Sequence, residues 1–151
     1  MKKIIFIIIL SLLFCLQSFA EYIPIPKEQS KQYKKEIEHV SKTQIPIAKK
    51  NIDNVFKEVE EEKDEYMKIN IIEYGIESEI FYFYIKLINV TEKYAKIKKF
   101  LPGGDSYTDL IEALNPYLND NKIKASEIKS FLNYSNKKQK ELEKKYNYLL
   151  E

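Results

Sequence analysis

The chain has 151 residues, with 25 basic and 23 acidic side chains, one cysteine and one histidine. Its hydrophobic fraction of 44% is that of an ordinary globular protein, which excludes collagen-like, disulfide-scaffold and disordered classes. All 25 of the basic residues are lysine. Because arginine makes most bidentate contacts to phosphates and base edges, its absence argues against specific nucleic-acid binding.

Residues 1–20 have the features of a cleaved signal peptide. Two lysines follow Met1, an apolar run comes next, and small residues occupy positions 18 and 20. This pattern predicts cleavage between Ala20 and Glu21. The apolar run is too short to span a membrane, and no later segment qualifies, so no transmembrane span is expected in the mature chain. A competing interpretation lipidates Cys15, but the bulky Phe14 before it argues against a lipid anchor.

Export would change the charge and cysteine counts. Cleavage leaves residues 21–151, which contain no cysteine and, without Lys2 and Lys3, balance 23 basic against 23 acidic residues. The mature chain is therefore expected to cross the cytoplasmic membrane and to act in the periplasm or outside the cell. Lacking disulfides and thiolate chemistry there, it must depend on core burial or association.

The mature chain is predicted to be one helical domain after a short leader. Residues 21–26 are expected to be extended, because Pro24 and Pro26 disfavour helix in the residues before them. From residue 27 to residue 151 the apolar spacing is helical. The first helix is expected to end or kink at Pro46.

The longest pattern is a heptad repeat of apolar residues from Ala48 to Leu101, interrupted only at Glu62 and Glu73. If continuous, residues 47–101 would form a helix of about 80 Å. Gly75 is a weak point in it. The predicted fold class is all-α, a long helix folded back as a helical hairpin or small bundle.

An alternative fold class is α+β. Residues 67–89 are rich in β-branched and aromatic side chains, which favour strands, so a β-hairpin at 67–73 and 79–88 is the competing prediction. Helix is preferred because helical spacing continues on both sides. The supposed turn around Gly75 also lacks an Asn-Gly or Asp-Gly pair.

The C-terminal third is predicted to be a loop followed by helices. Residues 100–105 include a proline and two glycines and are the clearest loop. A helix is expected after Ser106, with a break near Pro116 and a last helix from Ser126. If the loop reverses the chain, residues 62–70 face residues 137–145.

That reversal would bring opposite charges together. Residues 58–65 hold six acids and one lysine, and residues 137–145 hold five lysines and two acids. Exposed pairs are each worth a few tenths of a kcal/mol, so they would set the register rather than the stability.

Two patterns resemble metal sites but fall short. Glu36 and His39 have the spacing of half a di-metal bundle site, which needs a second such motif. Residues 116–127 have the length of a calcium loop, but Pro116 and Leu118 stand where ligands should be. A solvated histidine and a polar turn are the preferred interpretations, and no metal or cofactor is expected.

Consecutive aromatic residues form the most informative local feature. On a helix, residues 81–84 would point around most of the circumference, so they must be covered from several sides. They are core residues, a partner or self-association surface, or the lining of an apolar pocket. The candidate interface or pocket residues are Phe81, Tyr82, Phe83, Tyr84 and Leu87.

These observations predict an exported, non-enzymatic helical interaction protein that binds a protein partner or itself. Periplasmic accessory factors and bacterial surface adhesins include chains of this general type. The alternative is a small extracytoplasmic binding protein for an apolar ligand. An enzyme is disfavoured because the mature chain has no cysteine, no arginine and one histidine, which leaves few groups for a nucleophile and its base.

Overall fold

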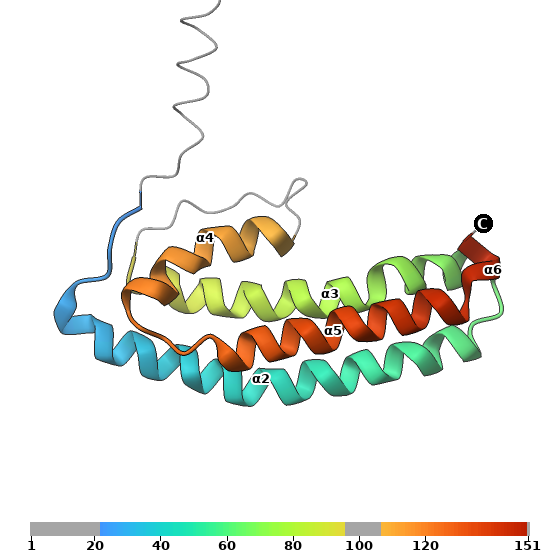
Figure 1. Ribbon diagram of the computed structural model, residues 1–151, viewed down its shortest axis with the longest axis horizontal. Helices are drawn as coiled ribbons and strands as arrows, with labels where there is room; N and C mark the ends of the chain where they lie inside the picture. Colours follow the sequence, from blue (N-terminus) through green and yellow to red (C-terminus); the bar gives the residue numbers. More distant parts are fainter. Residues whose placement is uncertain (1–21, 96–106, 151) are drawn as a thin grey trace, which may run out of the picture.

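The computed structural model describes residues 22–95 and 107–150, and this part of the chain is all-α (Figure 1). The helices are α2 (Lys27–Glu61), α3 (Glu65–Glu92), α4 (Tyr107–Asp120), α5 (Ser126–Lys145) and the short α6 (Asn147–Leu150). The alternative hairpin at 67–73 and 79–88 is wrong, since both segments lie inside α3. The predicted cleavage site at Ala20 and Glu21 and the predicted loop at 100–105 lie outside the described residues.

Helix α2 continues through Pro46, so of the two outcomes expected there, an end or a kink, the end is wrong. Its buried residues recur at helical spacing on one face, while Pro46 is exposed. A proline leaves the carbonyl four residues earlier without an N–H donor. That residue, Lys42, is exposed as well, so water can bond its carbonyl and the helix can continue.

The chain reverses at residues 62–64, so the heptad repeat over 47–101 does not form one continuous helix. The Glu62 carboxylate accepts hydrogen bonds from the backbone N–H groups of Lys63 and Asp64, at 2.7 and 3.0 Å. Asp64 then caps α3 by accepting from the Met67 N–H at 2.9 Å. Thus Glu62, which interrupts the heptad repeat, marks the end of one helix and the approach to the next.

Helices α2 and α3 form a hairpin, which agrees with the predicted fold class, although the sequence placed the reversal in the loop at 100–105. The Asn51 amide donates to the Glu79 carboxylate at 3.0 Å across it, and Gly75 lies opposite Val55. A Cβ at Gly75 would be 3.0 Å from Val55 Cγ1, so the glycine permits a close approach of the two helices. Gly75 is therefore a packing position inside α3 and does not break the helix.

Helix α4 packs on α3 and runs in the same direction (Figure 1). It continues through the exposed Pro116, so the predicted break there is wrong. The chain then reverses at residues 121–125, where Lys122 has a φ of 51° in the left-handed region. Helix α5 returns antiparallel to α3 and parallel to α2, which completes a three-helix bundle.

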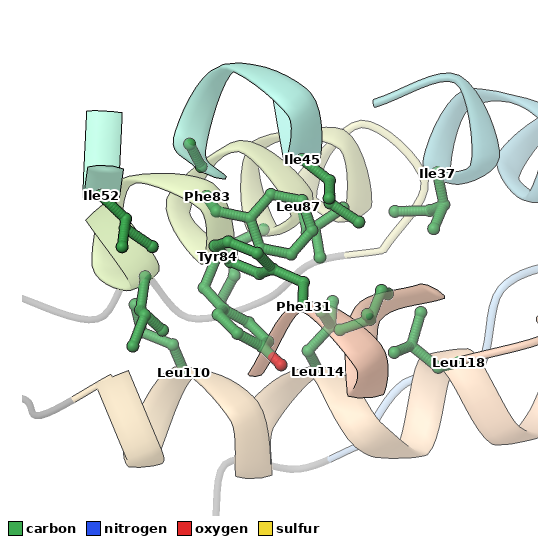
Figure 2. Packing of buried hydrophobic residues seen from close by; sticks show 14 of the residues in the cluster. Ile37, Ile45, Ile52, Phe83, Tyr84, Leu87, Leu110, Leu114, Leu118 and Phe131 are labelled. Atoms are coloured by element: carbon green, nitrogen blue, oxygen red, sulfur yellow. The ribbon is translucent and has the colours of Figure 1, made fainter. Parts of the chain in front are cut away.

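The hydrophobic core lies between α2, α3 and α5 and extends under α4. Figure 2 shows Phe131 of α5 between Leu87 of α3 and Leu114 of α4. Two polar residues of α5 also face inward. Ser135 is buried and donates to the Phe131 carbonyl, and the half-buried Gln139 donates to the Ile72 carbonyl at 2.9 Å. The weak part of the α5 apolar pattern is therefore inside the bundle.

Residues 22–26 are not helical and lie against the C-terminal end of α4. Ile25 is buried, and the ring of Tyr22 stacks edge-on against Tyr117 with centroids 4.9 Å apart. The Tyr22 hydroxyl donates to the carboxylate of Asp120. These contacts attach the segment before α2 to the reversal between α4 and α5.

Candidate functional site

The aromatic run on α3 divides between the core and the surface. Phe83, Tyr84 and Leu87 are at most 2% exposed, and the Phe83 ring packs edge-on against Phe131 with centroids 5.0 Å apart (Figure 2). Phe81 is half-buried, and Tyr82 is 62% exposed. Neighbours therefore cover the run on two sides and leave Tyr82 accessible.

A groove with a volume of about 180 Å³ lies between α2 and α3 beside Tyr82. Ile47 and Ala48 form part of its α2 wall, and the hydrogen bond from Asn51 to Glu79 crosses between the two helices next to it. Ile47 is 52% exposed. The groove therefore joins an exposed aliphatic residue of α2 to the exposed tyrosine of α3.

A continuous uncharged stripe runs along the outward face of α3. We call it the outer α3 stripe, and its residues follow i, i+4, i+7 spacing: Met67, Ile71, Tyr74, Ser78, Tyr82 and Ile85. Met67, Tyr74 and Tyr82 are 50%, 56% and 62% exposed, while Ile71 and Ile85 are half-buried. At 1.5 Å per residue the stripe is about 27 Å long.

Sequence reasoning included Tyr82 of this stripe and missed the rest. The heptad repeat draws attention to the buried face of α3, where Ile76, Ile80 and Leu87 lie. The stripe forms a second repeat of mostly apolar residues, on the side of α3 opposite its buried face. That second repeat was the signal in the sequence that could have revealed the stripe. A helix that is apolar on nearly all sides must be covered on all of them or expose one, and α3 exposes this stripe.

Charged residues of both signs flank the stripe. Helical spacing places Glu77 beyond one edge of the stripe and Glu79 along the edge nearest α2, while Glu73 lies further round the helix. Lys68 and Lys86, on the α2 side, are the two basic residues of α3. Helix α4, which packs on α3, contains three acids and no lysine, whereas α5 contains six lysines and three acids. Acids therefore outnumber lysines on α3 and α4, whereas lysines outnumber acids on α5.

A second polar cluster ties the start of α2 to the end of α3. The buried hydroxyl groups of Tyr33 and Thr91 are hydrogen-bonded at 3.0 Å, and burial raises the pKa of Tyr33 to about 12. Nearby, Glu36 accepts hydrogen bonds from the Tyr94 hydroxyl and from Lys93, and these bonds lower the pKa of its carboxyl group. The cluster fastens two helix ends together.

In the two patterns that resemble metal sites, the side chains make ordinary protein contacts or are exposed. His39 is exposed, while Glu36 is engaged by Tyr94 and Lys93. In the calcium-loop pattern, the Asn121 amide donates to the Tyr117 carbonyl and Asp120 accepts from Tyr22. Within residues 22–95 and 107–150, no three histidine, cysteine, aspartate or glutamate side chains gather into a group that could hold a metal ion.

Comparison with known proteins adds no relative. No protein-family profile matches the sequence, and no curated protein or solved structure is significantly similar to it. Among the helices in the described part of the chain, none has the length and apolar composition needed to cross a bilayer.

Proposed function

We propose that the protein is an exported, non-enzymatic helical interaction protein that binds another protein through the outer α3 stripe. The exposed apolar face of α3 carries this proposal. Exposed, contiguous apolar patches with a polar rim are typical of interaction sites. Tyrosine and methionine, which the stripe exposes at positions 67, 74 and 82, are enriched at interface cores.

The proposed location is the periplasm or the cell surface, where the protein would act as an accessory or adhesin-like factor. Support comes from residues 1–20, with their positive start, apolar run and small residues at 18 and 20. Mass spectrometry of the protein purified from its host should find Glu21 at the N-terminus. An uncleaved chain, or one that begins at a lipidated Cys15, would contradict this part of the proposal.

A binding protein for an apolar ligand remains the alternative, and the groove beside Tyr82 gives it little support. Its volume of about 180 Å³ is below the roughly 300–1,000 Å³ of pockets that bind drug-sized ligands. Polar Gln44, Asn51 and Glu79 make up much of its lining. An extended partner lying along the stripe suits this surface better than an enclosed small molecule does.

The test is photo-crosslinking in the cells that export the protein. Benzoylphenylalanine replaces Tyr74 or Tyr82, and the matched control replaces His39, which is exposed on the face of α2 opposite its buried residues. We expect one discrete protein adduct from positions 74 and 82, none from position 39, and loss of the adduct when Ile71→Lys is added. Equal adducts from all three positions, or none from 74 and 82, would refute the proposed function.

A further inference from the structure

We propose that a basic face of the bundle, formed by α2 and α5, lies against an anionic membrane surface. The members of this basic face are exposed lysines on the outer sides of the two helices: Lys42, Lys50, Lys57, Lys129, Lys137, Lys140 and Lys144. Since α3 is the third helix of the bundle, the basic face lies on the side away from α3. The inference therefore goes beyond the proposed function and concerns a second surface.

Helical spacing gathers lysines on the outer side of α5. Those of the basic face follow Lys129 at i+8, i+11 and i+15, on the side of α5 opposite the buried Phe131 and Leu142. Helix α5 as a whole contains six lysines and three acids. Residues 42–57 of α2, which run beside it, contain four lysines and one acid. Lysine thus outnumbers acid on both helices of the face.

The outer lysines keep their charge uncompensated, while lysines at the seam between the two helices are paired. Lys138, at the seam, lies 3.1 Å from Asp53, which is the single acid of residues 42–57. Within the described residues, Lys137 is the one member of the basic face that has an ion pair. Its partner, Glu141, is 3.8 Å away and is shared with Lys138. The face therefore presents a positive surface to solvent.

The side chains of the face suit a membrane better than a protein or a nucleic acid. Among the described residues of α2 and α5, the one exposed large apolar side chain is Ile47, which lines the groove beside α3. Protein interfaces are enriched in aromatic residues and depleted of lysine, and sites for single-stranded nucleic acid add aromatic platforms for the bases. An anionic bilayer needs neither, because its surface potential attracts each nearby lysine as a point charge.

Shape also fits an extended, planar partner. Helices α2 and α5 run in the same direction side by side, so the face is two helices wide (Figure 1). From Lys129 to Lys144 it extends about 22 Å at 1.5 Å per residue. With this face on the lipid, the outer α3 stripe points away from the membrane. Because the attachment depends on charge and has no apolar anchor, salt should reverse it.

Vesicle co-sedimentation tests the proposal with the chain from Glu21, which contains every residue of the described bundle. Vesicles with equal amounts of phosphatidylglycerol and phosphatidylcholine should bind the chain at low salt and release it at high salt. Vesicles of phosphatidylcholine alone should not bind it. Equal binding to both vesicles, binding that salt does not weaken, or no binding overturns the proposal. Tighter binding to duplex DNA than to the anionic vesicles, at equal salt and phosphate concentration, overturns it as well.

Charge variants locate the bound surface. Lys137→Glu with Lys140→Glu should weaken vesicle binding at least about tenfold, whereas Lys137→Arg with Lys140→Arg, which keeps the charge, should stay within about twofold. The matched control, Lys68→Glu with Lys86→Glu on α3, makes the same change in net charge and should stay within about threefold. All four lysines lie outside the buried core, and circular dichroism checks that each variant is folded. Equal weakening by both glutamate pairs, or none by the first, overturns the proposal.

Single fluorescent labels then show which side of the bundle meets the lipid. The chain from Glu21 contains no cysteine, so Asn133→Cys and Ser78→Cys each provide one labelling site. Asn133 is exposed among the lysines of α5, and Ser78 is exposed in the outer α3 stripe. On anionic vesicles the label at 133 should become shielded from acrylamide quenching, while the label at 78 should stay accessible. No shielding at 133, or equal shielding at both positions, overturns the proposal and leaves the proposed function standing.

Discussion

Buried Tyr33 joins the first long helix to the end of the second. Its side chain is fully buried, and its hydroxyl group bonds that of Thr91, which also donates to the Leu87 carbonyl at 2.9 Å. The helical spacing of the apolar residues Tyr33 and Ile37 predicts that Tyr33 faces the core. Thr91 gave no such signal, because a threonine on a helix is usually solvated and one of its two partners, Tyr33, is 58 residues away in the sequence.

Tyr33 predicts a loss of stability at alkaline pH. Burial raises its pKa to about 12 in the folded state, against about 10 in the unfolded chain. Its stabilising effect is complete below pH 10 and is lost as the pH rises through 12, because only the unfolded chain releases the proton in between. Chemical denaturation measures the free energy of unfolding at several pH values. Between pH 10 and pH 12 this free energy should fall by about 2 to 3 kcal/mol less in the Tyr33→Phe variant than in the unaltered protein.

The control is Tyr74→Phe, at an exposed tyrosine of the same molecule. It should leave the alkaline decline unchanged. At neutral pH, Tyr33→Phe should cost about 1 kcal/mol for the lost hydrogen bond, since Thr91 keeps its bond to Leu87. An alkaline decline of equal size in the Tyr33→Phe variant and the unaltered protein would contradict the role given to Tyr33.

Gly75 is explained by its neighbour Val55. The sequence indicates a weak point in a helix, and only the packed hairpin shows that a Cβ there would meet Val55 Cγ1 at 3.0 Å and Cγ2 at 3.3 Å. Alanine would gain about 1 kcal/mol of helix propensity and lose part of it to this crowding. The two effects oppose each other at one site.

A double-mutant cycle separates them. In thermal or urea denaturation, Gly75→Ala alone should change the free energy of unfolding little. In a Val55→Ala background, which removes both crowding methyl groups, the same change should stabilise by about 0.5 to 1 kcal/mol more. Additive effects of the two substitutions would show that the close contact does not limit position 75.

At the scale of helices, the fold class and the helical state of residues 67–89 could be predicted from spacing alone. The division of the heptad repeat into α2 and α3 could not, because the repeat has the same phase on both sides of the reversal. The turn depends on two side chains, because Glu62 accepts from the N–H groups of residues 63 and 64, and Asp64 accepts from that of Met67. A run of charged residues gives a weak signal for such a turn, since the same run also suits an exposed helix face.

Asp64 is expected to hold this reversal together. Replacing it with alanine removes the acceptor for the Met67 N–H and should cost about 1 kcal/mol in the free energy of unfolding. Asp64→Asn keeps an acceptor of similar capping strength and should restore most of that loss. Urea denaturation of the three proteins measures the series. Equal destabilisation by Ala and Asn would mean that the carboxylate charge, rather than the cap, matters.

For the whole molecule, the sequence predicted the contact between opposite charges better than it predicted the topology. Glu60 and Lys145 form an ion pair, as the complementary segments suggested, and Gln139 meets Ile72 in an antiparallel register near the expected one. The acids at 58–61, however, belong to α2, to which α5 is parallel. The outer α3 stripe could not be placed either, because exposure depends on where α4 and α5 pack.

Carbodiimide crosslinking with mass spectrometry tests this topology, because the reagent joins carboxylates and lysines in direct contact. We expect adducts of Asp53 with Lys138 and of Glu60 with Lys145, since both pairs are ion pairs in which α2 and α5 run in the same direction. Lys138→Gln should remove the first adduct and preserve the second. If α5 ran in the opposite direction along α2, Lys138 would instead be joined to Glu60 and Lys145 to Asp53. These adducts would contradict the parallel arrangement of α2 and α5. The position of α4 and the exposure of the outer α3 stripe depend on that arrangement.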